Sequence, residues 1–197
     1  VVVNAPNRRR VFQLAITAED GRDKGRPSAW SSAIDALAHN TEAGRTRLFI
    51  VSAGNVEGPD KYSRYPASNS KESIKDPAQA WNALTVGAYT ELDRIDEKRS
   101  GDYHPVARAG ELSPYSATSM PWDSQWPYKP DIVLEGGNLI DDGFGAVECE
   151  SLDLLTTYNK PLDRLFSTTS ATSAASALAS HMAPKICAAY PRLRAET

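Results

Sequence analysis

The stretch RLFSTTSATSAASALASHMAP, residues 164–184, decides how the fold and function of this chain are interpreted. Four hydroxyl residues, 167–170, stand directly before a long run of Ala and Ser. Ser and Thr are favoured caps at the start of a helix, so a purely structural role is one explanation. The other is a nucleophile, because the free amides and the positive dipole at a helix start stabilise negative charge on a neighbouring oxygen. Other segments of the sequence are needed to distinguish the structural role from the catalytic one.

Short apolar runs along the chain predict an α/β fold. Each run is nearly continuous in apolar residues, as is typical of parallel strands that are covered on both faces. The expected strands are 10–16, 47–53, 83–89 and 130–134, with a short fifth strand at 165–169. We therefore predict a mostly parallel sheet with helices on both faces, in a single domain over residues 1–197.

Two helices are expected to cover this sheet. Ser28 can cap a helix over 29–40, and the apolar spacing along that segment places four side chains on one face. Those four side chains are Trp30, Ile34, Leu37 and Ala38. A longer helix is expected to run from Ser170 towards Tyr190, and Pro184 should kink it or end it near Ala183.

Composition limits the classes of partner. The 197 residues carry a net charge of −3, which gives no basic footprint for nucleic acid. No apolar run reaches the length of a membrane span, so we expect no membrane partner. Cys149 and Cys187 lie far apart without a metal-type spacing, which favours two free thiols in a reducing, cytoplasmic compartment over a single disulfide. No cofactor is expected.

Three segments carry the functional interpretation. IVSAGN, residues 50–55, is a strand that ends in small residues, Gly54 and Asn55. KPDIVLEGGN, residues 129–138, is a strand that runs into a double glycine, which indicates a tight turn or close packing. TTSATSAA, residues 168–175, places Ser170 at the start of the last helix. Each segment alone is common, and their order is the informative feature.

In this order the segments resemble the subtilisin-like serine proteases (subtilases, peptidase family S8), and the resemblance covers essentially the whole chain. It implies that Ser170 is the nucleophile and that Asn55 supplies one oxyanion-hole donor. It also implies that an extended polypeptide substrate lies along the segments near 15–17 and 51–53. The implied substrate-binding residues are Ala15, Ile16, Thr17, Ser52, Ala53, Gly54 and Thr169.

Three positions depart from the family's pattern. Thr168 stands where Gly is usual, Thr172 where Ala is usual, and Ala174 where Pro is usual. The general base is a larger departure. In these proteases the chain order is Asp, His and then Ser, and neither the Asp nor the His motif is found in this sequence. The chain therefore resembles the middle and later part of a catalytic domain, truncated at both ends. We expect the missing triad residues on an upstream segment, and we expect this chain alone to be inactive.

The three histidines of the chain do not readily replace that base. His39 ends the first helix, where a cation is favourable. His104 lies in a long loop and is a weak candidate. His181 is eleven residues after Ser170, or about 16 Å along a helix, which is too far for proton transfer.

Other candidate groups have structural explanations that we favour. Asp141 and Asp142 could bind calcium but too few oxygen ligands accompany them, and Glu148 to Glu150 is expected to be a solvated loop without a metal. Trp122, Trp126 and Tyr128 could line a cleft or anchor a long loop.

We therefore expect a serine endopeptidase that works through an acyl-enzyme. The alternatives are a non-catalytic peptide-binding domain of the same fold, or a different α/β hydrolase or nucleotide-binding protein. The absence of G-x-S-x-G, P-loop and GxGxxG motifs counts against the last two.

Overall fold

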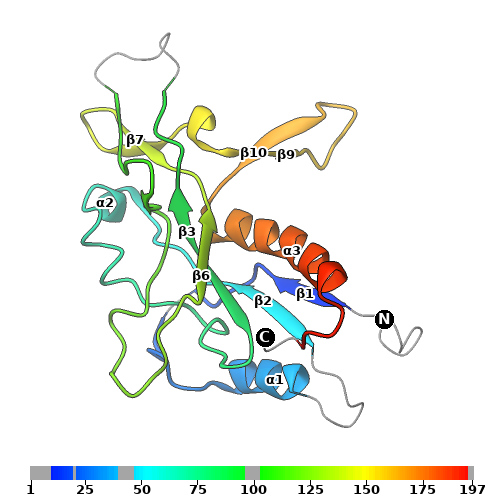
Figure 1. Ribbon diagram of the computed structural model, residues 1–197. Helices are drawn as coiled ribbons and strands as arrows, with labels where there is room; N and C mark the ends of the chain where they lie inside the picture. The colour runs from blue at the N-terminus through cyan, green and yellow to red at the C-terminus, as the bar shows by residue number, and fades with distance from the viewer. Residues whose placement is uncertain (1–9, 20, 40–46, 96–102, 195–197) are drawn as a thin grey trace.

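The computed structural model describes residues 10–19, 21–39, 47–95 and 103–194. Three sheets and three α-helices make up this part of the chain (Figure 1). The helices are α1 (Ala29–Ala38), α2 (Pro59–Tyr62) and α3 (Ala171–Ala189), with a 3-10 turn at Glu150–Leu152. The strands are β1 (Val11–Leu14), β2 (Leu48–Ser52), β3 (Leu84–Thr90), β4 (His104–Pro105), β5 (Glu111–Leu112), β6 (Ile132–Glu135), β7 (Leu139–Asp141), β8 (Ala146–Glu148), β9 (Leu154–Thr157) and β10 (Phe166–Thr169).

The main sheet is mostly parallel, as the apolar runs predict. Its order is β1-β2-β3-β5, and β6 also pairs with β3. Strands β1, β2, β3 and β6 run parallel, and only the short β5 is antiparallel to its neighbour. Because the carboxyl ends of parallel strands meet at one edge, the segments that follow β2 and β6 are brought to the same side of the molecule.

Helices cover both faces of this sheet, as expected. Ile34 and Ala38 of α1 pack with Phe49 and Val51 on one face. Alternate residues of the same strands, including Ile50 and Val86, pack on the other face against Ala175, Ala179 and Ala183 of α3. The run of small residues in α3 is therefore explained by close packing of this helix on the sheet (Figure 1).

The sequence places both helix starts correctly but errs in two details. Ser28 caps α1 through a capping box with Ser31, yet Trp30 and Leu37 are exposed, and Ser31 is buried instead. Of the two outcomes expected at Pro184, a kink or an end near Ala183, the end does not occur, because α3 continues to Ala189. Pro184 lies on the exposed side of the helix, where the carbonyl that loses its N–H donor can be solvated.

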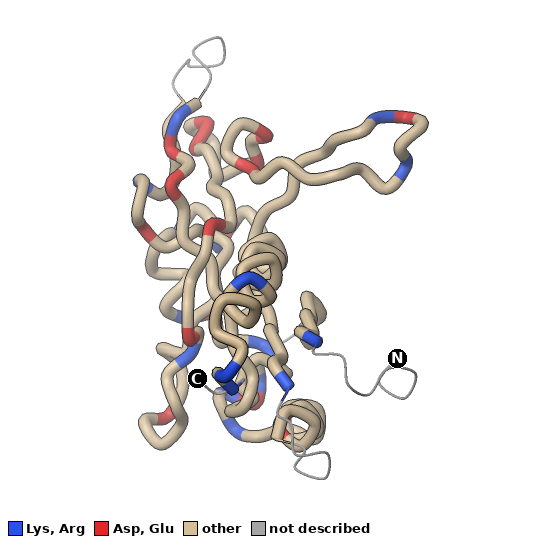
Figure 2. Tube along the Cα trace, turned by 45° about the vertical axis from the view of Figure 1, so that its right-hand side comes forward, with Lys and Arg blue, Asp and Glu red and all other residues tan. Residues whose placement is uncertain are grey.

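The predicted fifth strand exists but does not belong to the main sheet. β10 pairs antiparallel with β9 in a hairpin of its own, and Thr169 stands opposite Leu154. This hairpin projects from the body of the molecule and carries charged residues at its tip (Figure 2). Several of its apolar side chains are exposed, namely Leu155, Leu162, Leu165 and Phe166.

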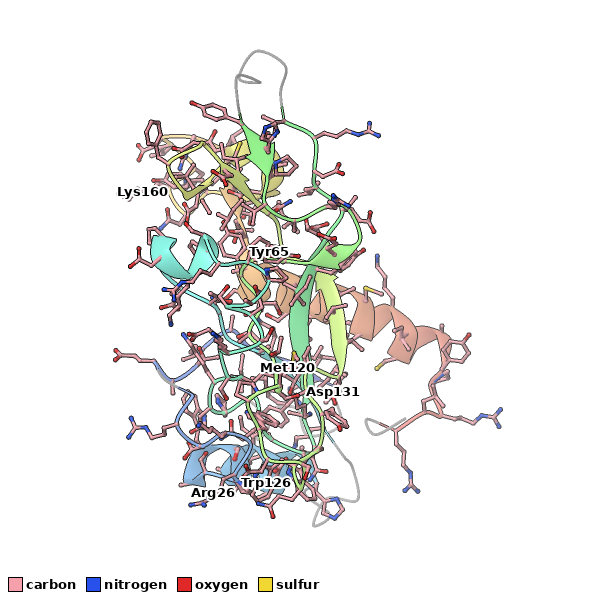
Figure 3. The ribbon with its side chains drawn as sticks, turned by 90° about the vertical axis from the view of Figure 1, so that its left-hand side faces the viewer. Arg26, Tyr65, Met120, Trp126, Asp131 and Lys160 are labelled. Carbon is pink, nitrogen blue, oxygen red and sulfur yellow. The ribbon has the colours of Figure 1, made fainter. Side chains whose placement is uncertain are left out.

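The aromatic residues of the long loop anchor it to the domain, which was one of the two expected roles. The Trp122 indole donates to the Ser73 hydroxyl at 2.8 Å. Trp122 and Trp126 also pack so closely on Gly25 that a Cβ there would lie within 3 Å of both. Trp126 and Arg26 lie together at the end of the molecule that holds α1 (Figure 3). Tyr128, in contrast, is 88% exposed.

No helix among the described residues combines the length and hydrophobicity that crossing a bilayer requires.

Candidate active site

Ser170 sits at a sharp junction between β10 and α3. It is the N-cap residue of α3 and has an extended backbone, with φ −145° and ψ −169°. The next residue, Ala171, has φ +67°, in the left-handed region that L-residues with a Cβ rarely adopt. Backbone strain of this kind persists only where surrounding contacts enforce it, and it is frequent at functional sites.

The double glycine provides the contact that enforces this junction. The N–H of Ala171 donates to the carbonyl of Gly136 at 2.6 Å. A Cβ on Gly136 would lie 2.4 Å from the Ala88 Cβ and 3.1 Å from the Ala171 carbonyl oxygen. A Cβ on Gly137, which has φ +79°, would lie 3.1 Å from the Ser170 Cβ. The predicted close approach at this turn is therefore confirmed, and its partner is the Ser170 junction.

The structure brings Asn55 to the same junction. The Oδ1 atom of Asn55 accepts hydrogen bonds from the Thr172 N–H at 3.2 Å and from the Thr172 hydroxyl at 2.6 Å. A backbone N–H can only donate, so the amide oxygen must face Thr172 and the Asn55 Nδ2 group must face away. Within the described part of the chain, no hydrogen-bond acceptor is found for that Nδ2 group, which leaves its N–H bonds available to a ligand.

Asn55 also explains why the Ser170 hydroxyl is not a helix cap. An N-cap side chain normally accepts from the second or third amide of its helix, and Thr172 supplies the second amide of α3. Asn55 already bonds that amide, and the Ser170 side chain forms no capping bond. No described acceptor bonds the Ser170 N–H either. A hydroxyl that makes no capping bond and two sets of donors without a described acceptor thus meet at one helix start, which favours the nucleophile over the cap.

Two side chains that the sequence did not single out flank Ser170. Tyr115 is 3% exposed, and its hydroxyl lies beside the Ser170 side chain. Burial raises the pKa of Tyr115 above its usual value, which the nearby Ser170 hydroxyl partly offsets. Tyr115 therefore stays a neutral phenol near pH 7 and does not serve as a base.

Asp153 is the second of these side chains. The β9–β10 register places it opposite Ser170, and a Cβ on Gly137 would lie 3.4 Å from its Oδ1 atom. Burial raises the pKa of Asp153 to about 6, Thr168 partly offsets this, and Glu148 and Glu150 add to the increase. The Oδ1 atom of Asp153 is buried without a hydrogen-bond partner. No signal in the sequence reveals this position, because it depends on strand register.

None of the three histidines bonds Ser170. His39 is the C-cap of α1, as expected from its place in the sequence. His104 lies exposed in β4, paired with Asp141 of β7, and His181 is exposed on α3. Among the described residues, no base is therefore in hydrogen-bond contact with the Ser170 hydroxyl.

The implied substrate-binding residues fall into two groups. Ile16 is 63% exposed just after β1, and Ala15 and Thr17 are also accessible. Ser52, Ala53 and Gly54 are buried. The Ala53 N–H bonds the Val86 carbonyl, and its own carbonyl accepts from Lys75.

The main-chain donor and acceptor of Ala53 are both used within the domain, because β2 lies between β1 and β3. Pairing of a substrate strand along 51–53 stays a prediction. Gly54 has φ +95°, and Lys75 packs against it. Thr169 is half-buried and pairs with Leu154 of the hairpin.

The other polar groups are accounted for by local structure. The Asp141 and Asp142 carboxylates accept backbone N–H groups in the turn between β7 and β8. Among the described residues, no group of His, Cys, Asp and Glu could hold a metal ion. Cys149 and Cys187 are both free, as predicted.

The chain belongs to the subtilase family, peptidase family S8, which matches residues 1–197. It is 32% identical to the uncharacterized protein y4bN of Sinorhizobium fredii, over 96% of this chain and 44% of that protein. Among solved structures it is similar to the S41 psychrophilic protease, with 20% identity and a TM-score of 0.51, over 98% of this chain and 48% of that one.

The chain thus spans about half the length of these relatives. Family membership supports a peptidase function, and the structural likeness concerns the fold.

Proposed function

We propose that this chain is the nucleophile-bearing part of a serine endopeptidase, which hydrolyses extended polypeptides through an acyl-enzyme. The observation that carries the proposal is the Ser170 hydroxyl at the start of α3, which does not cap the helix, with the Asn55 amide bonded to the same helix start. In acyl transfer, the Ser170 oxygen attacks the scissile carbonyl while a base accepts its proton. The carbonyl oxygen then becomes an oxyanion.

Two donors in this chain can stabilise that oxyanion. They are the Ser170 N–H, at the positive end of the α3 dipole, and the Asn55 Nδ2 group. Loss of one such donor costs about a hundred- to a thousandfold in kcat, a magnitude taken from subtilisin as a reference case. The carboxylate and the imidazole of the triad are proposed to lie on a segment that precedes these residues in the whole protein.

The proposal is tested on the full-length protein with a fluorophosphonate probe, whose site of attachment is located by peptide mass spectrometry. We expect labelling on Ser170 and its loss in Ser170→Ala, together with loss of peptide hydrolysis. Ser173→Ala is the matched control, because Ser173 lies one turn further along α3 and should leave labelling unchanged. Hydrolysis that persists in Ser170→Ala would overturn the assignment.

The second candidate is a non-catalytic domain that grips extended peptides. It is favoured by the absence of a base in contact with Ser170 among the described residues. Binding of peptides by the full-length protein without labelling or hydrolysis would support this alternative over the protease.

A further inference from the structure

We infer that the Thr172 hydroxyl is a positioning residue for the oxyanion donor Asn55. This inference rests on the proposed function and adds to it a residue that the family's pattern does not supply, since Ala is usual at this position. Thr172 would act only through Asn55, with no contact to the reacting atoms.

The contact between the two side chains is short and shielded from water. The Thr172 hydroxyl donates to the Asn55 Oδ1 atom at 2.6 Å, and Thr172 is 0% exposed. A hydrogen bond in such surroundings is stronger than one that competes with solvent. The Thr172 N–H binds the same oxygen at 3.2 Å, so one residue holds Oδ1 from two directions.

Two donors fix more than one donor can. If only the Thr172 N–H bonded Oδ1, the Asn55 carboxamide could still rotate while it kept that one hydrogen bond. The second bond removes that freedom and so fixes the direction in which Nδ2 points. Oxyanion stabilisation depends on donors that are already oriented before the charge develops, so the loss of orientation lowers kcat more than it affects KM.

The structure also shows why Thr172 is available for this task. It is the second residue of α3, and its side chain is directed at Asn55 rather than at a carbonyl of the preceding turn. β-Branched residues have few χ1 rotamers, so the hydroxyl is held in place by the side chain's own stiffness. The Asn55 amide is thus attached to the same helix start that presents Ser170.

The test compares Thr172→Val with Thr172→Ser in the full-length protein. Thr172→Val keeps the shape and the N–H but removes the hydroxyl, and we expect kcat to fall about tenfold with KM within twofold of the parent. Thr172→Ser restores the hydroxyl and should recover kcat to within about threefold. Unchanged kcat in Thr172→Val would overturn the inference.

A double-mutant cycle separates positioning from a general structural effect. In an Asn55→Ala background, Thr172→Val should cause little further loss of kcat, because the group it orients is gone. An undiminished loss in that background would show that Thr172 does not act through Asn55, and would overturn the inference.

An inactive parent protein would overturn the proposed function and would leave no kcat to measure. A double-mutant cycle on the equilibrium constant for unfolding still tests the inference in that case. The hydroxyl–carboxamide bond predicts coupling of about fivefold or more in the unfolding constant between Thr172→Val and Asn55→Ala. The absence of coupling would refute the contact on which the inference stands.

Discussion

Replacing Asp153 by Asn should change how the stability of the protein depends on pH. Burial and the nearby Glu148 and Glu150 raise the pKa of Asp153 from 3.8 to about 6. Between these pH values the folded state keeps a proton that the unfolded state loses. The free energy of unfolding therefore falls as the pH rises from about 4 to about 6 or 7, and Asp153 contributes its full stability only below this range.

The size of this fall follows from the shift in pKa. About two units at 1.36 kcal/mol per unit give an upper limit of about 3 kcal/mol. Asp153 is only half-buried, so solvent screening reduces the expected value to about 1 kcal/mol. Asp153→Asn cannot ionise, and its stability relative to the parent should rise by this amount between pH 4 and pH 7.5.

Urea unfolding of the full-length protein at several pH values between 4 and 8 measures the difference. Taking the difference between variant and parent cancels the contributions of the other titrating groups. Asp163→Asn is the matched control, because Asp163 is exposed near the tip of the hairpin, and its difference should stay flat. In a protein that carries Glu148→Gln and keeps Asp153, the loss of stability with rising pH should begin at lower pH, because Glu148 helps to raise the Asp153 pKa. A difference that is flat, or that falls with pH, would refute the placement of Asp153 in a poorly solvated site.

Two further predictions concern packing and burial around the sheet. Gly136→Ala should lower the free energy of unfolding by about 1–3 kcal/mol, because the new Cβ would lie 2.4 Å from the Ala88 Cβ. Gly145→Ala, where a Cβ meets no close neighbour, should change it by less than about 0.5 kcal/mol. Equal effects of the two substitutions in denaturant unfolding would contradict the close packing at Gly136. Lys129→Met should lower the free energy of unfolding by about 2–4 kcal/mol, because the buried ammonium bonds Asp131 at 2.7 Å and the Ala83 carbonyl at 2.9 Å. Lys61→Met, which breaks a partly exposed pair with Glu72, should lower it by only about 0–1 kcal/mol. The reverse order in thermal unfolding would rule out this ranking.

The sequence predicts the central sheet well because burial on both faces leaves a strong signal. In the strand β2, Phe49 and Val51 pack on one face and Ile50 on the other, so both faces need apolar side chains. The segment 165–169 is predicted as a strand, and the structure places it in the β9–β10 hairpin, outside the main sheet. An apolar run shows that a segment is extended and does not reveal its neighbour in space.

The β9–β10 hairpin shows why other parts were missed. Neither strand has a fully buried residue: β9 alternates between half-buried and exposed side chains, and β10 is half-buried after an exposed Phe166, so no strongly apolar face marks them. The available signal was local, namely LLTT and FSTT on either side of a turn that contains Asn, Pro and Asp. The position of Asp153 beside Ser170 follows from the register of this hairpin, so it could not be predicted before the hairpin was known.

The two roles of Asn55 explain why an amide is needed at the end of β2. At this junction one side chain must accept hydrogen bonds from Thr172 and also leave donors free beside Ser170. An aspartate could accept the same bonds but has no N–H to offer, and a serine has a single donor on a shorter side chain. Because the accepting half of Asn55 bonds the start of α3, the donating half is fixed to the element that carries the proposed nucleophile. Movement of α3 would then carry Ser170 and the proposed oxyanion donor together, so the distance between them is maintained by the same contact that stabilises the helix.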